Sequence, residues 1–182
     1  MDLLQDLPKY KELLEQYGDD LIGFITFIQG YNHSLTHREI VFLSRVKCPG
    51  CCVKEPNMFE NAPLVALWYF LFRPSSYFVY IAKNQEKEKL FIHGIRLLLD
   101  YLKKTEHAWI LNYIQVKQNS ISIVDSYTCI RTKSGKLVHT HLAGFNGPDL
   151  MIWIDQHKEQ THENMYIAKG CLTAATHRLV LA

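Results

Sequence analysis

Two histidines and two cysteines in the N-terminal third of the chain have the spacing of metal ligands. His33 and His37 are followed, after a further ten residues, by Cys48 and Cys51 in a Cys-x2-Cys arrangement. Thiolate and imidazole groups suit a tetrahedral zinc ion, and the intervening residues allow a helix between the two ligand pairs. The alternative is that the histidines flank a helix start at the surface and the cysteines form a loop turn. A zinc-containing interaction domain is therefore one hypothesis for this chain.

A second pair of histidines lies on a predicted strand. His139 and His141 are separated by Thr140, so both imidazoles project from one face of the strand. Together with Tyr166 and Lys169 on a later predicted helix, they resemble the HUH nickases, in which paired histidines hold a metal and a tyrosine attacks the DNA. The interval from the histidines to the tyrosine is short for that family. A strand that carries two histidines on its solvent face is the simpler interpretation.

Two aspartates near a lysine provide a third constellation. Asp149 and Asp155 precede Lys158, and two carboxylates with a lysine are the groups that a PD-(D/E)xK nuclease uses around a divalent cation. That motif needs an acid two residues before its lysine, and position 156 is a glutamine. We therefore interpret Asp149 as a turn residue. A Ser-His-Asp set, a P-loop motif and a GxGxxG motif are absent from the sequence.

Composition bounds the class of protein. The chain has 182 residues, a formal net charge of +2 and five cysteines. This length suits one domain with a sizeable core, so neither a disulfide nor a metal is needed for folding. The sequence has no long uncharged apolar run and no signal-peptide pattern, which predicts a protein outside the membrane with reduced thiols. Near-neutral charge argues against a nucleic-acid coat protein.

The sequence before residue 73 predicts helices. Thr36 and Glu39 have the spacing of a capping box, and Gly18 suits a helix C-terminus. The second half of the segment before Arg73 is apolar on almost every face, which predicts a buried central helix. The expected elements are a helix over 3–17, an apolar stretch over 21–27, helices over 36–46 and 57–72, and a loop over 47–56.

The sequence after residue 74 predicts a sheet packed on helices. Asn84 has the position of an N-cap, with acidic residues after it and lysines at the far end of the helix. Short connections with turn residues favour antiparallel neighbours. The fold class is therefore mixed α/β, with a mostly antiparallel twisted sheet of about five strands and about six or seven helices. The strands are expected at 77–81, 108–116, 120–131, 136–145 and 149–155, and the helices at 84–104 and 159–180.

Four segments in constant order carry a family resemblance. The first ends in Tyr-Gly-Asp-Asp, the second reads Thr-His-Arg-Glu-Ile, the third is a strand and turn, and the fourth joins Lys-Ser-Gly-Lys to His-Thr-His. They lie at residues 10–20, 36–40, 112–119 and 133–141. Taken together, they resemble the N-terminal, cap-snatching endonuclease domain of the orthomyxovirus polymerase acidic subunit.

This resemblance implies a PD-(D/E)xK endonuclease-like fold with a carboxylate-rich site for two Mn²⁺ or Mg²⁺ ions. The family's site positions fall on His37, Lys83, Asn112, Ile123 and Lys133. Asp125 lies two residues after Ile123, on the same strand face, and is the nearest substitute for the missing acid. A lysine and an asparagine in place of two acids remove about two negative charges and disfavour a pair of dications.

The resemblance therefore points to the thogotovirus-like branch, in which the site is degenerate. It implies one endonuclease-like domain over 1–182, the N-terminal piece of a larger subunit, without catalytic activity and with no cofactor. The expected partners are the two basic polymerase subunits of a heterotrimer that transcribes and replicates negative-strand RNA, with viral or capped host RNA as possible ligands. The isolated domain is expected to be a monomer, and the implied locations are the host nucleus and the virion. Mn²⁺ or Mg²⁺ binding is expected only if the site is less eroded.

Overall fold

Helices dominate the first third of the structure, as the sequence pattern predicts. The computed structural model describes residues 4, 6–29, 35–46, 52–54, 59–73, 75–136, 149–155, 158–171 and 176–181. Thr36 and Glu39 form the predicted capping box, because the Thr36 N–H donates to Glu39 Oε2 at 2.8 Å and the Glu39 N–H donates to Thr36 Oγ1 at 3.3 Å. The elements here are α1 (Pro8–Tyr17), α2 (Leu21–Gln29), α3 (His37–Val46), β1 (Cys52–Lys54), the 3-10 helix η2 (Phe59–Asn61) and α4 (Ala62–Phe72).

A strand, a long helix and a run of strands follow. Asn84 caps the long helix, since its side chain accepts a hydrogen bond of 2.9 Å from the Lys87 N–H. The elements are β2 (Ser76–Ala82), α5 (Gln85–Leu102), the 3-10 helix η3 (Ala108–Tyr113), β3 (Ile114–Val116), β4 (Ser120–Ile123), β5 (Cys129–Ser134), β6 (Asp149–Ile154), α6 (Lys158–Cys171) and β7 (Thr176–Leu181). No helix in these described segments is both long and apolar enough to cross a bilayer.

The strands form one sheet in the order β1-β7-β6-β2-β5-β4-β3. The mixed α/β class and the number of helices are confirmed. The expected antiparallel majority is wrong, because four of the six neighbouring pairs are parallel and only β3, β4 and β5 form an antiparallel meander. Within the described residues the sheet has seven strands, where about five were expected. The crossover through α5 leads from β2 to β3, and the meander that follows returns β5 parallel to β2. The crossover through α6 places β7 parallel to β6.

Three expected elements differ from the structure. The segment 108–116 begins as η3 and becomes a strand only at Ile114. The segment 120–131 is two strands, separated by a turn in which Asp125 has a φ of 56°. Aspartate tolerates this left-handed conformation, so the chain reverses there and pairs with itself. The strand expected over 136–145 lies outside the described residues after Lys136.

Two further differences lie at the edge of the sheet. β1 falls inside the expected loop 47–56, and the expected helix 159–180 divides into α6 and β7. β1 and β7 pair with each other in parallel, so each is stabilised by a partner far away in the sequence. Periodicity within a short window carries no signal for such pairing.

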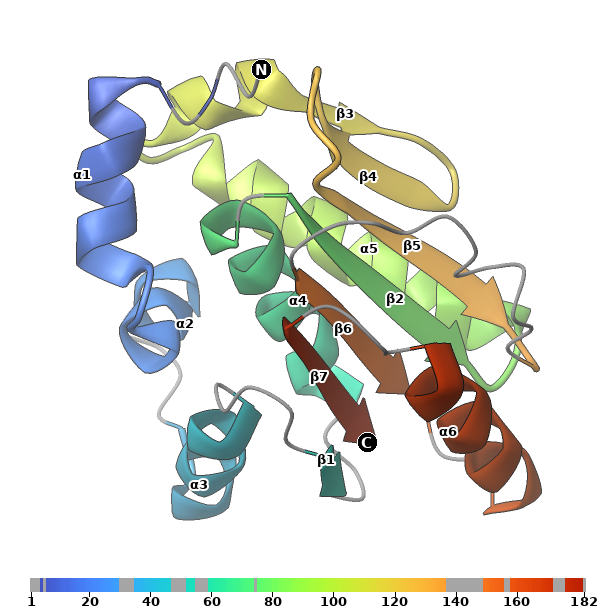
Figure 1. Cartoon of the computed structure of the whole chain (residues 1–182). Helices are drawn as coiled ribbons and strands as arrows, with labels where there is room; N and C mark the ends of the chain where they lie inside the picture. The colour runs from blue at the N-terminus through green and yellow to red at the C-terminus, as the bar shows by residue number, and fades with distance from the viewer. Residues whose placement is uncertain are drawn as a thin grey trace.

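The sheet has a hydrophobic core on each face. On one face, α4 is buried along all eleven of its residues, which confirms the predicted central helix, and the rings of Tyr80 and Phe91 stack at 4.0 Å between β2 and α5. On the other face, a smaller cluster of aliphatic residues from β2 and β6 packs against Ile167 and Ala168 of α6. Figure 1 shows α4 and α5 behind the sheet and α6 in front of it, with α1, α2 and α3 at one side.

Candidate functional site

The carboxyl ends of the parallel strands meet at one edge of the sheet. In Figure 1 the arrowheads of β2, β5 and β6 point toward this edge. Ligands of open α/β sheets bind outside the carboxyl ends of the strands, so this edge is the first place to look for a site. The chemistry-bearing side chains that follow or end strands here are Asp155 after β6, Lys83 after β2 and Lys133 in β5.

Asp155 is the acid that the fold presents at this edge. It follows β6, in which all six residues are buried, and its N–H donates to the carbonyl oxygen of Ile81 at 2.9 Å. Its Oδ2 atom is buried, and its carboxyl group lies beside the phenol of Tyr80. Burial, together with the Asp155 carboxylate, raises the pKa of Tyr80 far above its ordinary value, so that phenol stays neutral. A buried carboxylate oxygen at the end of a central strand is suited to hold a cation or to accept a proton.

The N-terminus of α4 provides the second part of the site. α4 begins after the connection that leaves the carboxyl end of β1, and Asn61 is its N-cap. The Asn61 side chain makes no cap hydrogen bond, and its Nδ2 atom instead donates to Glu39 Oε1 at 3.3 Å. This bond places a carboxylate of α3 beside the first turn of α4. A helix N-terminus favours anions, and here the anion comes from the protein itself.

The residues predicted from the family resemblance do not come together. Lys83 follows the carboxyl end of β2, whereas Asp125 lies in the turn after β4. The register pairs Tyr77 with Cys129, and Cys129 with Ser122, so this turn lies beside the amino end of β2. β2 has seven residues, which corresponds to about 20 Å between the two edges.

The other predicted positions are distributed in the same way. Asn112 belongs to η3 and Ile123 is buried at the end of β4, and the pairing of Ile114 with Ile123 places both near the edge that carries Asp125. Lys133 pairs with Ile81 and therefore lies near the edge that carries Lys83. His37 is the first residue of α3 and is exposed. This distribution does not support a shared two-metal site at the family positions.

The other sequence constellations are only partly within the described residues. His33, Cys48 and Cys51 of the zinc hypothesis, and His139 and His141 of the nickase hypothesis, lie outside them. Tyr166 is on α6 and is 78% exposed. Within the described segments, no three histidine, cysteine or acidic side chains cluster as metal ligands would.

Asp149 begins β6 and Asp155 follows its end, so the two acids lie at opposite edges of the sheet. Asp149 is the first residue of β6 and is buried, so it is a strand residue and the turn interpretation is wrong. Sequence spacing indicated Asp155 only as a nuclease acid. The stronger signal was its position after the apolar run Leu-Met-Ile-Trp-Ile, because an acid that ends a buried strand is typical of the ligand edge of a parallel sheet.

Comparison with known proteins extends the description of the fold. No protein-family profile and no curated protein sequence matches the chain. Among solved structures, the chain is similar to the crystal structure of the HK97 bacteriophage large terminase, with a TM-score of 0.62 and 10% sequence identity over 91% of this chain. The match spans 37% of the length of the terminase chain. At this identity the likeness shows the fold alone, and it agrees with the predicted mixed α/β class. The chain therefore has the fold of part of a viral terminase.

Proposed function

We propose that the chain is a catalytically inactive α/β domain of a viral protein that handles nucleic acid, and that it works by binding. The terminase-like fold supports the class of protein. The observation that carries the inactivity is the hydrogen bond from Asn61 to Glu39 at the N-terminus of α4. This bond fixes a carboxylate where the fold would otherwise receive a phosphate group.

The framework of a nucleotide site supports this interpretation. In a P-loop protein, a strand leads through a glycine-rich loop to a helix, backbone N–H groups and a lysine hold the phosphates, and an aspartate holds the metal ion. Here β1 leads to α4, β7 lies between β1 and β6, and Asp155 follows β6. The chain has no glycine from Cys52 to Arg73, and Asn61 and Ala62 stand at the start of the helix.

Charge opposes a phosphate at this helix. At neutral pH the Glu39 carboxylate repels a phosphate charge about 5 Å away by about 3 kcal/mol at an effective dielectric constant of about 20. Asp155 follows β6 and the cationic Lys83 follows β2. These two strands are neighbours in the sheet and run parallel, so the two residues lie near each other at the same edge. One acid beside a lysine is a poor site for the paired dications of a nuclease.

The test uses the full chain with two substrates. We expect no phosphate release from Mg²⁺-ATP, and no cleavage of single-stranded RNA or of duplex DNA with Mn²⁺, above a reaction without protein. Either activity above this background, if Asp155→Asn removes it, refutes the inactive interpretation. Thermal melting of Asp155→Asn serves as the control for folding.

A narrower assignment places the domain in an orthomyxovirus-type polymerase. It is supported by the four co-linear segments of the sequence, and it makes the two basic polymerase subunits the partners, RNA a possible ligand, and the host nucleus and virion the locations. The expected result is co-purification of the full chain with both subunits when the three are expressed together. Co-purification with neither subunit refutes this assignment.

The zinc and nickase hypotheses are separate proposals that rest on sequence spacing alone. Metal analysis tests the first: one zinc per chain, lost on Cys48→Ser, supports a zinc-containing interaction domain. A covalent adduct between Tyr166 and single-stranded DNA supports the second, and its absence in the presence of Mg²⁺ or Mn²⁺ refutes it.

A further inference from the structure

A cavity of about 370 Å³ lies between α5 and the turn that joins β3 to β4. One wall is a face of α5, and the other wall is formed by Gln118 and Asn119. It lies beyond β2, on the side of the sheet away from β1, so it is distinct from the site described above. The cavity is larger than a single small ion needs, which leaves room for a group attached to that ion.

Basic and amide side chains line the cavity. Lys89, His93 and Arg96 are spaced at i, i+4 and i+7 on α5, so they lie on one face of the helix. The carboxamides of Gln118 and Asn119 line the wall across from them. In the described part of the chain, neither Lys89 nor Arg96 forms an ion pair with an acid. These cations are therefore available to a ligand.

The one acid in the lining is already engaged by the protein. Glu88 Oε1 accepts a hydrogen bond of 2.7 Å from the hydroxyl of Thr132, whose residue is only 6% exposed. The Thr132 N–H in turn donates to the carbonyl oxygen of Asn119 at 3.1 Å. Glu88 thus connects α5 to β5 and the turn, and two positive charges face one negative charge.

Hydrogen bonds hold the two walls at a fixed separation. Arg96 Nη2 donates to the carbonyl oxygen of Lys117 at 3.4 Å, which joins α5 directly to the turn. The Lys117 N–H donates to the carbonyl oxygen of Ser120 at 2.8 Å and closes the turn itself. The remaining N–H donors of the Arg96 guanidinium stay available. Because the bond to Lys117 already restrains Arg96, an anion that binds to it has a smaller entropic cost than at an untethered arginine.

We propose that this cavity binds a phosphate group. Arginine and lysine with flanking amide donors match the tetrahedral oxygens of phosphate, and arginine adds a two-point contact. The phosphate can belong to a free small molecule or to the backbone of a nucleic acid, since both present the same oxygens to the cavity. This site does not depend on the inactivity of the edge that carries Asp155.

The test titrates the full chain with inorganic phosphate and, separately, with a six-nucleotide oligothymidine, at constant ionic strength. The readout is the NMR signals of the side-chain amides of Gln118 and Asn119. The test variant is Lys89→Gln with Arg96→Gln, and the matched control is Lys103→Gln with Lys104→Gln, which changes the charge equally at the far end of α5. Both variants are checked for folding by thermal melting.

We expect saturable shifts that weaken at least tenfold in the test variant and less than twofold in the control. Tighter binding of the oligonucleotide than of phosphate identifies a nucleic-acid backbone as the source, and equal or weaker binding identifies a free phosphate compound; both support the site. The absence of saturable shifts with either probe refutes it, as do equal losses in the two variants.

Discussion

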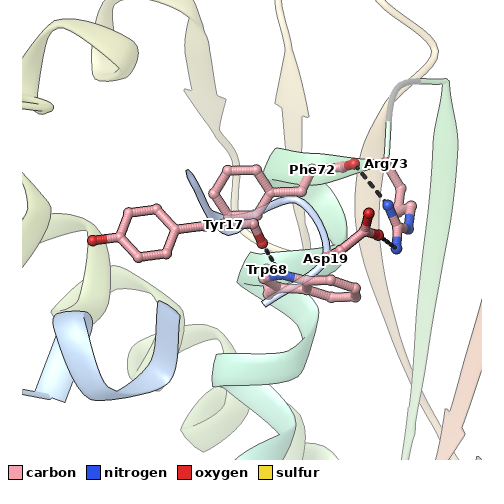
Figure 2. Close-up of polar contacts among 5 residues, drawn as sticks. All are labelled: Tyr17, Asp19, Trp68, Phe72 and Arg73. Atoms are coloured by element: carbon pink, nitrogen blue, oxygen red, sulfur yellow. Dashed lines mark hydrogen bonds and ion pairs between the residues drawn. The ribbon is translucent and has the colours of Figure 1, made fainter. Parts of the chain in front are cut away.

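The indole Nε1 of Trp68 donates a hydrogen bond of 2.8 Å to the carbonyl oxygen of Tyr17 and so joins the centre of α4 to the end of α1 (Figure 2). Trp68 is completely buried. The Tyr17 carbonyl is at a helix C-terminus, so it has no partner within α1, and it also accepts a hydrogen bond of 3.2 Å from the Asp20 N–H. This bond connects residues that lie 51 positions apart, and a second bond, from the Tyr10 hydroxyl to the carbonyl oxygen of Leu71 at 2.7 Å, joins the same two helices.

Trp68→Phe is therefore expected to be strongly destabilising. It removes the donor and leaves a cavity, which together lower the free energy of unfolding by about 2–4 kcal/mol. Urea denaturation followed by circular dichroism measures this change. Trp109→Phe is the control, because Trp109 is only partly buried against the core. Equal losses in the two variants would show that the bond to Tyr17 contributes little.

Arg73 stabilises the junction of α1 and α4 more through its contact with the Trp68 ring than through its ion pair with Asp19. Its guanidinium carbon lies 4.8 Å from the centre of the Trp68 ring, and its Nη2 atom is 3.4 Å from Asp19 Oδ1 (Figure 2). The Asp19 side chain is 99% exposed, so solvent screens this ion pair. We expect Asp19→Asn to change the free energy of unfolding by less than about 0.5 kcal/mol, and Arg73→Ala to lower it by about 1 kcal/mol. The reverse order, measured by urea denaturation, contradicts this assignment.

Alkaline pH is expected to destabilise the domain through two neighbouring groups of β2 and β5. Burial raises the pKa of Tyr77 to about 12 and that of Cys129 to about 11, although Arg131 lowers both. The unfolded chain releases these protons near pH 9 to 10 while the folded chain still holds them, so stability falls as pH rises from about 9 to 12. Each group contributes a slope of at most about 1.4 kcal/mol per pH unit.

Urea denaturation at a series of pH values measures this slope. The variant Tyr77→Phe with Cys129→Ser should have a shallower loss of stability above pH 9. Tyr127→Phe is the control, because Tyr127 is 85% exposed and is expected to leave the slope unchanged. An identical slope in all three proteins contradicts the prediction.

Local signals predicted the helices well, whereas strand partners required the whole fold. The capping residues Thr36 and Asn84 make the hydrogen bonds that their spacing predicts, because a cap depends on residues only three positions away. β6 was also predicted at nearly its observed bounds, since it is an apolar run bounded by turn residues and an acid. The predicted antiparallel direction of most strand pairs was wrong, because the direction depends on the segment that connects two strands, such as α5.

The candidate site was harder to predict for the same reason. Glu39 and Asn61 are 22 residues apart, and only the folded chain brings them within hydrogen-bond distance. The family resemblance predicted that Lys83 and Asp125 share one pocket. The register of β2, β5 and β4 instead places them at opposite edges of the sheet. A co-linear match fixes order along the chain, and it does not fix which edge of a sheet a residue reaches.

The role of Glu39 at α4 can be tested by reversing the local charge. Glu39→Gln with Asn61→Lys replaces the carboxylate by an amide and supplies a cation at the helix N-terminus, where an anion is favoured. We expect this variant to bind inorganic pyrophosphate at least tenfold more tightly than the wild type, which corresponds to about 1.4 kcal/mol or more. Glutamine can keep the capping box with Thr36. Asn61 is only 4% exposed, so the new lysine is expected to lower the melting temperature, and thermal melting checks that the variant is folded. Isothermal titration calorimetry measures the affinity.

The matched control is Glu60→Gln with Asn61→Lys, which makes the same change of charge at an exposed neighbour. Because the Glu60 side chain is screened by water, its neutralisation should add much less affinity than that of Glu39. A larger gain in the Glu39 variant assigns the exclusion of phosphate to the carboxylate that Asn61 holds in place. Equal gains in both variants would show that the lysine alone provides the affinity and that Glu39 does not exclude phosphate. No gain in either variant would mean that the missing glycines of the connection exclude phosphate by themselves, because backbone N–H groups cannot then approach it.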